Sequence, residues 1–266
     1  MKITHVVKEF FSVGSGAEIY VYELARQQVK SGNDVTIVAP ILGGEIRRKA
    51  EAVGVRCVTP QGAFGSSDIF HVHHPGVLSD SILSAAPVVA TLHDLRDSHE
   101  RRGRVKAWIV VREDQRQEGD VFIPNPIDTE RFKPMSEIQR VVPVVLCCGN
   151  FRDDRRKAML DDLCSQAKTG QAVIMFVGNG LRHLHEHGVR VYPPTWETEK
   201  FLKACNLTAS LYVGRTVIEG WLCGRGGWVY QPDGTKVLMA PPTDAAFRFS
   251  AASVAEQVEE IYRRAI

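Results

Sequence analysis

Residues 3–40 read ITHVVKEFFSVGSGAEIYVYELARQQVKSGNDVTIVAP. The apolar run Ile3–Val7 predicts a buried strand, and Ala17–Lys30 places its apolar residues at helical spacing. Ser31–Asp34 ends that helix, and Val35–Pro40 predicts the next strand. A buried strand, a helix and a second buried strand are typical of a parallel α/β unit.

The alternation of strands and helices continues to the end of the chain. A helix at Glu45–Val53 is followed by strands at Val55–Val58, Asp68–His73 and Val88–His93. After a proline-rich segment, Ile123–Pro134, the pattern restarts. The elements expected there are, in chain order, strand Val141–Cys148, helix Arg156–Lys168, strand Ala172–Val177, helix Leu181–His187, strand Val189–Tyr192, helix Glu197–Ala204, strand Thr208–Val213, helix Thr216–Cys223, strand Trp228–Gln231 and helix Ser250–Arg264.

This pattern predicts an α/β protein with two Rossmann-like, doubly wound domains. Because the proline-rich segment is the expected linker, the domains are predicted at residues 1–135 and 136–266, the second with a terminal helix. Two such sheets side by side place a ligand cleft between their carboxyl edges. We therefore expect the two domains to face a central cleft.

Composition narrows the class of protein. The chain of 266 residues is 44% hydrophobic and 24% charged, as in an ordinary globular protein, and its net charge of +2 is too small to predict a polyanionic partner. The six cysteines lack metal-ligand spacing, which predicts reduced thiols. No apolar run approaches the roughly 20 residues of a membrane span, and no secretory signal precedes the first strand. We expect a cytoplasmic protein without a transmembrane segment.

Two features of the first half lie where strands are expected to end. The loop Ser12–Glu18, SVGSGAE, has glycines that let the backbone approach a phosphate or a sugar, although a plain tight turn fits it equally well. His93 follows a strand and begins the sequence HDLRD. A histidine there can bind a polyhydroxylated ligand or satisfy a buried carbonyl.

The second half has two candidate phosphate-binding segments. In GNFRDDRRKA, Gly149–Ala158, a glycine at a strand end precedes basic residues that enter a helix, and at least one of these can reach a diphosphate. In GRTVIEGWLCG, Gly214–Gly224, Arg215 and Thr216 are expected at a helix N-terminus with Glu219 one turn inside. Such a helix start suits a diphosphate and a ribose, but a threonine-capped helix with a capping box is the alternative.

In this order, the motifs resemble those of glycosyltransferase family 4, which has the GT-B fold, over nearly the full chain. GSGAEIYVYELARQQVKSGNDVTIVAP is similar to the family's opening loop, helix and second strand, and PVVATLHD is similar to its strand and histidine. IPNPIDTERFKP resembles the interdomain stretch "IPNGVDxxxFxP". RRKAML resembles the "RKG" helix start, and GRTVIEGWLCGR resembles "G-x-T-x-x-E-A-x-A-C-G-x-P".

The resemblance implies a retaining, metal-independent hexosyl- or pentosyltransferase. Its co-substrate would be a nucleoside diphosphate sugar, a UDP-sugar in the first place, with no further cofactor and no metal, and its acceptor a hydroxyl group. The catalytic residues would be His93, Lys157 and Arg215. The donor-binding residues would be Ser15, Gly16, Gly149, Arg152, Lys157, Gly178, Tyr192, Arg215, Thr216 and Glu219.

The same resemblance assigns roles and shows where the chain departs from the family. Lys157, with Arg152 or Arg155, would bind the diphosphate, and Glu219 would hold the ribose. The segments at 177–180 and 192–194 would flank the base. The absence of an Asp-x-Asp motif agrees with metal independence. Two departures bear on sugar choice and on the diphosphate site, namely Leu211 for the first glutamate of the family's pair and Asn150 for its arginine.

Only the charge of one segment, Arg96–Arg116, indicates which class of acceptor the protein uses. It contains seven basic residues against four acidic ones, which gives +3. Such a run is usually a solvated face, but it also suits an anionic acceptor such as a modified base in DNA, or an anionic membrane surface.

Two other functions fit the sequence. A nucleotide-sugar epimerase could use His71, His73 and His93 as acid and base. A non-catalytic nucleotide-sugar-binding protein would explain Leu211.

Overall fold

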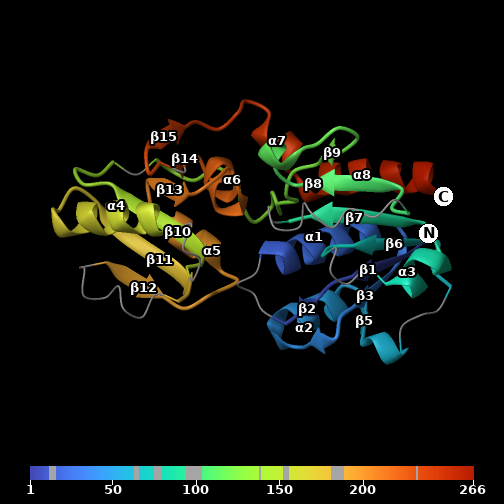
Figure 1. Ribbon diagram of the computed structural model, residues 1–266. Coiled ribbons are helices and arrows are strands. Elements are labelled where there is room, and N and C mark those ends of the chain that lie inside the picture. The colour runs from blue at the N-terminus through green and yellow to red at the C-terminus, as the bar shows by residue number, and fades with distance from the viewer. Residues whose placement is uncertain are drawn as a thin grey trace. The chain divides into compact units, whose positions relative to one another are not determined.

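The computed structural model describes residues 1–11, 16–62, 66–74, 79–93, 104–137, 139–151, 156–180, 189–231 and 233–266. The chain divides into two compact units (Figure 1). Unit 1 comprises Met1–Val13, Ala17–Pro126 and Arg248–Ile266, and unit 2 is formed mainly by Ile127–Phe247.

This division differs from the predicted one, because the chain returns to unit 1 at its end. Helix α8 (Ala251–Ala265) lies against the sheet of unit 1 (Figure 1). Its Tyr262 hydroxyl contacts His71, and its Glu259 accepts a hydrogen bond from Asn33. The pattern of the helix gave a correct apolar face, but such a face does not specify which of two sheets covers it.

Unit 1 contains a seven-stranded parallel sheet in the order β5-β3-β1-β6-β7-β8-β9. Its strands are β5 (Arg56–Val58), β3 (Asp34–Val38), β1 (Lys2–Val6), β6 (Ile69–Val72), β7 (Val88–Leu92), β8 (Ala107–Val110) and β9 (Val121–Phe122). The unit also has helices α1 (Gly16–Lys30), α2 (Gly44–Ala52) and α3 (Asp80–Ala85) and a short parallel pair, β2 (Glu9–Phe10) with β4 (Ile41–Leu42). Strand order reverses between β1 and β6, where doubly wound sheets bind ligands at their carboxyl edge.

Unit 2 contains a six-stranded sheet in the order β12-β11-β10-β13-β14-β15, in which only β15 is antiparallel among the described strands. Its strands are β10 (Val144–Asn150), β11 (Val173–Asn179), β12 (Arg190–Tyr192), β13 (Leu207–Ser210), β14 (Gly226–Tyr230) and β15 (Lys236–Met239). Its helices are α4 (Lys157–Lys168), α5 (Thr198–Leu202) and α6 (Arg215–Leu222), and α7 (Ala245–Arg248) follows at the boundary with unit 1. Here the strand order reverses between β10 and β13.

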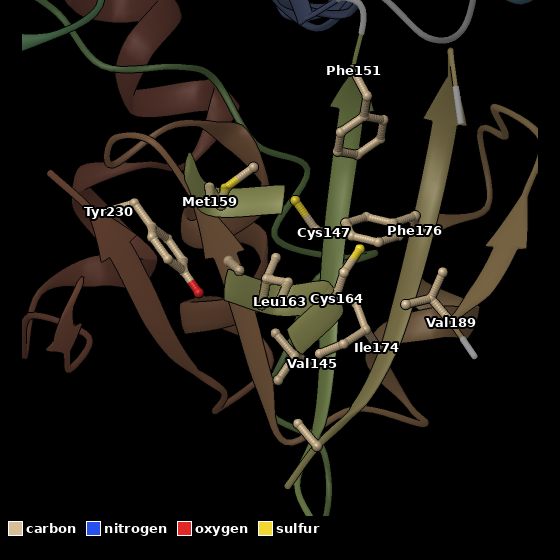
Figure 2. Close-up of a cluster of buried hydrophobic side chains, with 12 residues drawn as sticks. Val145, Cys147, Phe151, Met159, Leu163, Cys164, Ile174, Phe176, Val189 and Tyr230 are labelled. Carbon is tan, nitrogen blue, oxygen red and sulfur yellow. The ribbon is translucent and has the colours of Figure 1, made fainter. Parts of the chain in front are cut away.

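The core of unit 2 is apolar and rich in sulfur. Figure 2 shows Met159 and Leu163 of α4 facing Val145 and Cys147 of β10, with Phe176 of β11 beside them. Five of the six cysteines are buried and all six are free, as expected of reduced thiols. The core therefore fixes α4, whose first turn lies at the carboxyl edge of the sheet.

Most predicted elements are confirmed, within one to three residues at their ends. The structure adds β2, β4, β8, β9, β15, α3 and α7. The predicted helix Leu181–His187 lies outside the described residues. No helix in the described parts of the chain is long and apolar enough to cross a membrane.

Candidate functional site

Two glycines lie at the carboxyl edge of the unit 2 sheet. Gly149 of β10 and Gly178 of β11 lie opposite each other, with φ of +146° and +153°. A Cβ at Gly178 would lie 1.8 Å from the Gly149 carbonyl oxygen, and one at Gly149 would lie 2.9 Å from Arg156 Nη1. Gly178 therefore has to be glycine, because the backbone of β10 approaches it closely, whereas a side chain at Gly149 would displace the guanidinium of Arg156.

Arg156 lies against this edge. It directly precedes α4, and its guanidinium carbon is 5.3 Å from the centroid of the Phe151 ring. Its Nη1 atom is buried and has no hydrogen-bond partner among the described residues. A buried charged donor without a partner is costly, so this atom marks a position that an anionic ligand would satisfy.

The other basic residues of this segment are placed differently. Lys157 is exposed in the first turn of α4. Arg152 and Arg155 lie outside the described residues. The resemblance had singled out Lys157 with Arg152 or Arg155, whereas the structure brings Arg156 to the glycine edge. Three consecutive basic residues give no periodic signal that would have distinguished them.

The start of α6 does not form a capping box. Gly214, which has no side chain, is the N-cap residue, and no side chain caps the helix. Glu219 is 4% exposed, and its Oε1 accepts a hydrogen bond from Arg215 Nε at 2.7 Å. Its Oε2 accepts one from the Thr198 hydroxyl at 3.3 Å. The capping-box interpretation is wrong, and Glu219 instead forms a buried ion pair with Arg215.

The start of α6 and the end of β10 share the same edge of the sheet. The pKa of the Cys148 thiol lies well above its usual range, because the thiol is withdrawn from water and faces the Glu219 carboxylate. A hydrogen bond with the Thr216 side chain acts in the opposite direction on this pKa. Cys148 precedes Gly149, so Thr216 and Glu219 lie beside the glycine edge.

Two further predicted positions of unit 2 are half-buried. Tyr192 lies at the end of β12, where its ring centroid is 4.9 Å from that of Phe201 in a T-shaped contact. Leu211 packs against the apolar core of the unit. The place of the family's first glutamate is therefore taken by a side chain that contributes to packing.

In unit 1, the predicted glycine loop is described only at its end. Gly16 begins α1 and is exposed, and an added Cβ there would have no atom within 4 Å. Ser15 lies outside the described residues.

Four histidines lie on one face of the unit 1 sheet. His5 is opposite His71 in register, and His73 and His93 follow on the same side, since residues two apart on a strand share a face. His5, His71 and His73 are fully buried. Burial lowers the pKa of His5 to about 4 and that of His93 to about 3, and it holds the pKa values of His71 and His73 well below their usual range. All four rings are therefore neutral at physiological pH.

The ring nitrogens of three of these histidines, His5, His71 and His73, come within 4.8 Å of one another, so this cluster has the ligand types of a metal site. Each ring nitrogen of the three is already in a hydrogen bond with a side chain. The sequence pointed to His71, His73 and His93 through the strand ends that carry them. It missed His5, whose place on the same face follows only from the parallel register.

The basic segment Arg96–Arg116 is described from Arg104 onward. Its middle is β8, a buried strand of the sheet. Arg112 forms an ion pair with Asp114, and Arg116 pairs with Glu113 at 3.2 Å. Arg104 and Lys106 are exposed. The second half of the segment therefore offers less positive charge to a ligand than its composition suggested.

No protein-family model and no curated protein sequence matches the chain. Solved structures do share its fold. HepE of Anabaena, in complex with UDP and glucose, aligns with a TM-score of 0.72 at 15% identity over 98% of each chain. AviGT4, a glycosyltransferase of avilamycin A biosynthesis, aligns with a TM-score of 0.68 at 15% identity, over 99% of this chain and 98% of its own.

A third solved structure is an α-glucosyltransferase in complex with UDP and a 13-mer DNA that contains an HMU base. It aligns with a TM-score of 0.58 at 11% identity, over 86% of this chain and 79% of its own. These alignments show that the chain has the GT-B fold of glycosyltransferases.

Proposed function

We propose that the protein is a retaining, metal-independent glycosyltransferase that moves a hexosyl or pentosyl group from a nucleoside diphosphate sugar to a hydroxyl acceptor. The observation that carries the proposal is the Nη1 atom of Arg156, which is buried beside the Gly149–Gly178 edge and has no hydrogen-bond partner in the part of the chain that the structure describes. The GT-B fold of structures in complex with UDP supports the choice of a UDP-sugar as donor.

The residues at this edge suit the charges of such a donor. Arg156 would bind the diphosphate, and the helix start at Arg215 and Thr216 would add amide donors. When Arg215 turns toward the phosphate, Glu219 becomes available to accept the two hydroxyls of a ribose. The cationic groups would stabilise the charge that develops on the leaving diphosphate, a role that is often worth several kcal/mol.

The proposed reaction keeps the configuration of the transferred sugar. The bond from the anomeric carbon to the diphosphate breaks first, and the departing phosphate oxygen takes the proton of the acceptor hydroxyl on the same face. Lys157 and Arg215 are the proposed catalytic cations, and His93 is proposed to contact the sugar. Since the sequence has no Asp-x-Asp motif, these cations take the part that a divalent ion plays elsewhere.

A panel of nucleotides tests the donor site. Thermal unfolding is measured with UDP, ADP and GDP, and with UMP as the control that lacks the second phosphate. A ligand at 100 times its Kd adds about 2.7 kcal/mol of stability. We expect UDP to stabilise the protein and UMP to do so much less. Equal shifts with UMP and UDP, or no shift with any nucleotide, would overturn the proposed donor site.

Product analysis separates the enzyme from the two alternative functions. A glycosyltransferase releases UDP in an acceptor-dependent reaction that survives EDTA. An epimerase would convert the UDP-sugar to an isomer without an acceptor, and a binding protein would bind it without any turnover. Complete loss of activity in EDTA, restored by Mn²⁺, would contradict metal independence.

For the acceptor, we propose a modified base in DNA. The proposal rests on the fold shared with the α-glucosyltransferase bound to HMU-containing DNA and on the exposed basic residues Arg104 and Lys106. Arg112 and Arg116 are excluded from this role, because nearby carboxylates already neutralise them.

A further inference from the structure

A chain of hydrogen bonds crosses the interior of unit 1 and ends at His93. Gln28 Oε1 is 2.7 Å from His5 Nε2, and His5 Nδ1 is 2.9 Å from His73 Nε2. His73 Nδ1 is in turn 3.2 Å from His93 Nε2. Gln28, His5 and His73 are fully buried, so no water competes for these bonds.

These hydrogen bonds run in one direction, because each neutral ring donates from one nitrogen and accepts at the other. A carbonyl oxygen only accepts, so His5 Nε2 carries the proton toward Gln28. A neutral imidazole has one N–H, which makes His5 Nδ1 the acceptor of a proton from His73 Nε2. By the same rule His73 Nδ1 accepts from His93 Nε2. The proton of His93 then lies at Nε2, and its lone pair lies at Nδ1.

Tyr262 of α8 determines the orientation of the Gln28 side-chain amide. Gln28 Nε2 is 3.3 Å from the Tyr262 oxygen, and the Tyr262 hydroxyl is 2.5 Å from His71 Nδ1. His71 Nε2 contacts the Thr91 hydroxyl at 2.6 Å. Since the ring of His71 has only one proton, one of the two hydroxyls must donate to it, and a phenol is a stronger donor than an aliphatic alcohol. Tyr262 therefore donates to His71 and accepts from Gln28 Nε2, which turns Gln28 Oε1 toward His5.

We propose that Gln28, His5 and His73 are positioning residues that hold His93 in the Nε2-protonated tautomer. This inference rests on the proposed function, in which His93 contacts the transferred sugar. With its lone pair at Nδ1, His93 accepts a hydrogen bond from a sugar hydroxyl and cannot donate one from that nitrogen. The terminal helix takes part through Tyr262, although it is distant from His93 in sequence.

The hydrogen-bonded chain also explains the three-histidine cluster better than a metal does. A metal bound to His5, His71 and His73 would replace at least three of the hydrogen bonds between these rings and their partners. Metal binding is thus the competing outcome of the test.

Long-range ¹H–¹⁵N correlation spectra of the full-length protein, labelled with ¹⁵N in the histidine rings, give the tautomer of each ring. We expect the wild type to show His93 protonated at Nε2. Gln28→Met removes the fixed acceptor, and His93 should then become a mixture of tautomers. Gln28→Glu retains an acceptor and should restore the wild-type tautomer. Thr91→Val is the matched control. It removes an equally buried hydrogen bond, to His71, that is not part of the series from Gln28 to His93, and it should leave the tautomer of His93 unchanged.

A kinetic measurement links the tautomer to the reaction. With UDP-glucose as the probe, Gln28→Met should lower kcat for release of UDP about tenfold to a hundredfold, as expected for a lost positioning contact. The Kd for UDP should stay within about twofold, since a positioning contact to the sugar-binding histidine does not reach the diphosphate site. A merely structural role would change both or neither.

Three results would overturn the inference. These are an Nδ1-protonated His93 in the wild type, a His93 tautomer that Gln28→Met leaves unchanged, and a stoichiometric metal that shifts the ring signals of His5, His71 and His73. If the wild type fails to bind UDP-glucose, the proposed function fails. The spectra still decide whether the hydrogen bonds from Gln28 determine the tautomer of His93. A Gln28→Met variant that does not fold leaves the wild-type and Gln28→Glu spectra to decide.

Discussion

The two sheets of the protein bury different chemistry. Unit 1 covers its sheet with α1 and α8 and encloses a hydrogen-bonded set of polar side chains, His5 and His71 among them. Unit 2 packs α4 against an apolar, sulfur-containing core, and two of its polar side chains, Arg156 and Glu219, lie at the carboxyl edge of its sheet. The candidate site residues of unit 1 are thus placed by hydrogen bonds through its interior, whereas those of unit 2 lie beside glycines and helix starts at the rim.

The largest expected effect is a loss of stability from a substitution at the carboxyl edge of the unit 2 sheet. Gly178→Ala places a Cβ against the Gly149 carbonyl oxygen, and we expect the free energy of unfolding to fall by about 3 kcal/mol or more. Gly170→Ala is the control, since Gly170 also has positive φ, +72°, but no atom within 4 Å of an added Cβ. Its expected cost is about 1 kcal/mol. Urea unfolding followed by tryptophan fluorescence measures both, and equal costs would contradict the close approach of β10 and β11.

The second prediction concerns the pH dependence of stability, for which the buried histidines distinguish unit 1 from unit 2. The pKa of His5 is about 4 in the folded protein and about 6.5 when unfolded, so the unfolded state binds its proton first as the pH falls. The contribution of neutral His5 to the free energy of unfolding is fully present above pH 6.5 and is lost as the pH falls toward 4. The loss from His5 alone is roughly 3 kcal/mol. Hydrogen exchange resolved by peptide should show this loss in unit 1 over that range. The His5→Gln variant should show a smaller loss, and an unaltered pH dependence would argue against a buried neutral His5.

The third prediction tests the ion pair at the start of α6. Glu219→Gln should weaken the binding of UDP-glucose about 10- to 100-fold, because a charge-assisted pair of bonds to the ribose is lost. Glu199→Gln is the matched control, because Glu199 also forms a half-buried ion pair, 2.5 Å from Arg131. Titration calorimetry compares the two variants. If both lose affinity equally, Glu219 acts on stability and not on the donor.

The fourth and smallest effect concerns the acceptor and the rim of unit 1. Replacing Arg104 and Lys106 by alanine should weaken DNA binding about tenfold and flatten its salt dependence, whose log–log slope is about −0.9 per phosphate contact. Arg116→Ala is the control, because Glu113 already pairs with that guanidinium. The measurement is fluorescence anisotropy of labelled duplex DNA at several salt concentrations. DNA binding that the double substitution leaves unchanged would favour a lipid or saccharide acceptor.

The sequence predicted the two sheets well, because buried parallel strands and amphipathic helices leave strong local patterns. It missed β8, since Ala107–Val110 is a short apolar run inside a stretch dominated by charge. It also assigned the last helix to the second domain. That helix has an apolar face that fits either sheet, and its place is decided by contacts such as Tyr262 with His71, which are far apart in sequence.

The candidate site was predictable only in part, and for similar reasons. A glycine at a strand end, Gly149, indicated this edge of unit 2, and the family resemblance added Gly178, which the structure places opposite it. Consecutive basic residues leave no local pattern that shows which of them meets that edge, and of the two that the structure describes, Arg156 does so. The series of hydrogen bonds that leads to His93 joins Gln28, His5 and His73, which the fold brings together from separate elements. No local sequence pattern could therefore reveal it.

One measurement tests the central claim, that the edge of unit 2 binds the diphosphate of a nucleotide sugar. Calorimetric titration with UDP is compared between the wild type and Arg156→Met, with Lys168→Met at the other end of α4 as the control. We predict saturable binding that Arg156→Met weakens at least about tenfold, the least expected when a charge-assisted bond is lost, without loss of stability, because the guanidinium has an unpartnered buried nitrogen among the described residues. Lys168→Met should bind as the wild type does. UDP binding that is absent in the wild type, or equal in Arg156→Met and Lys168→Met, would contradict the account.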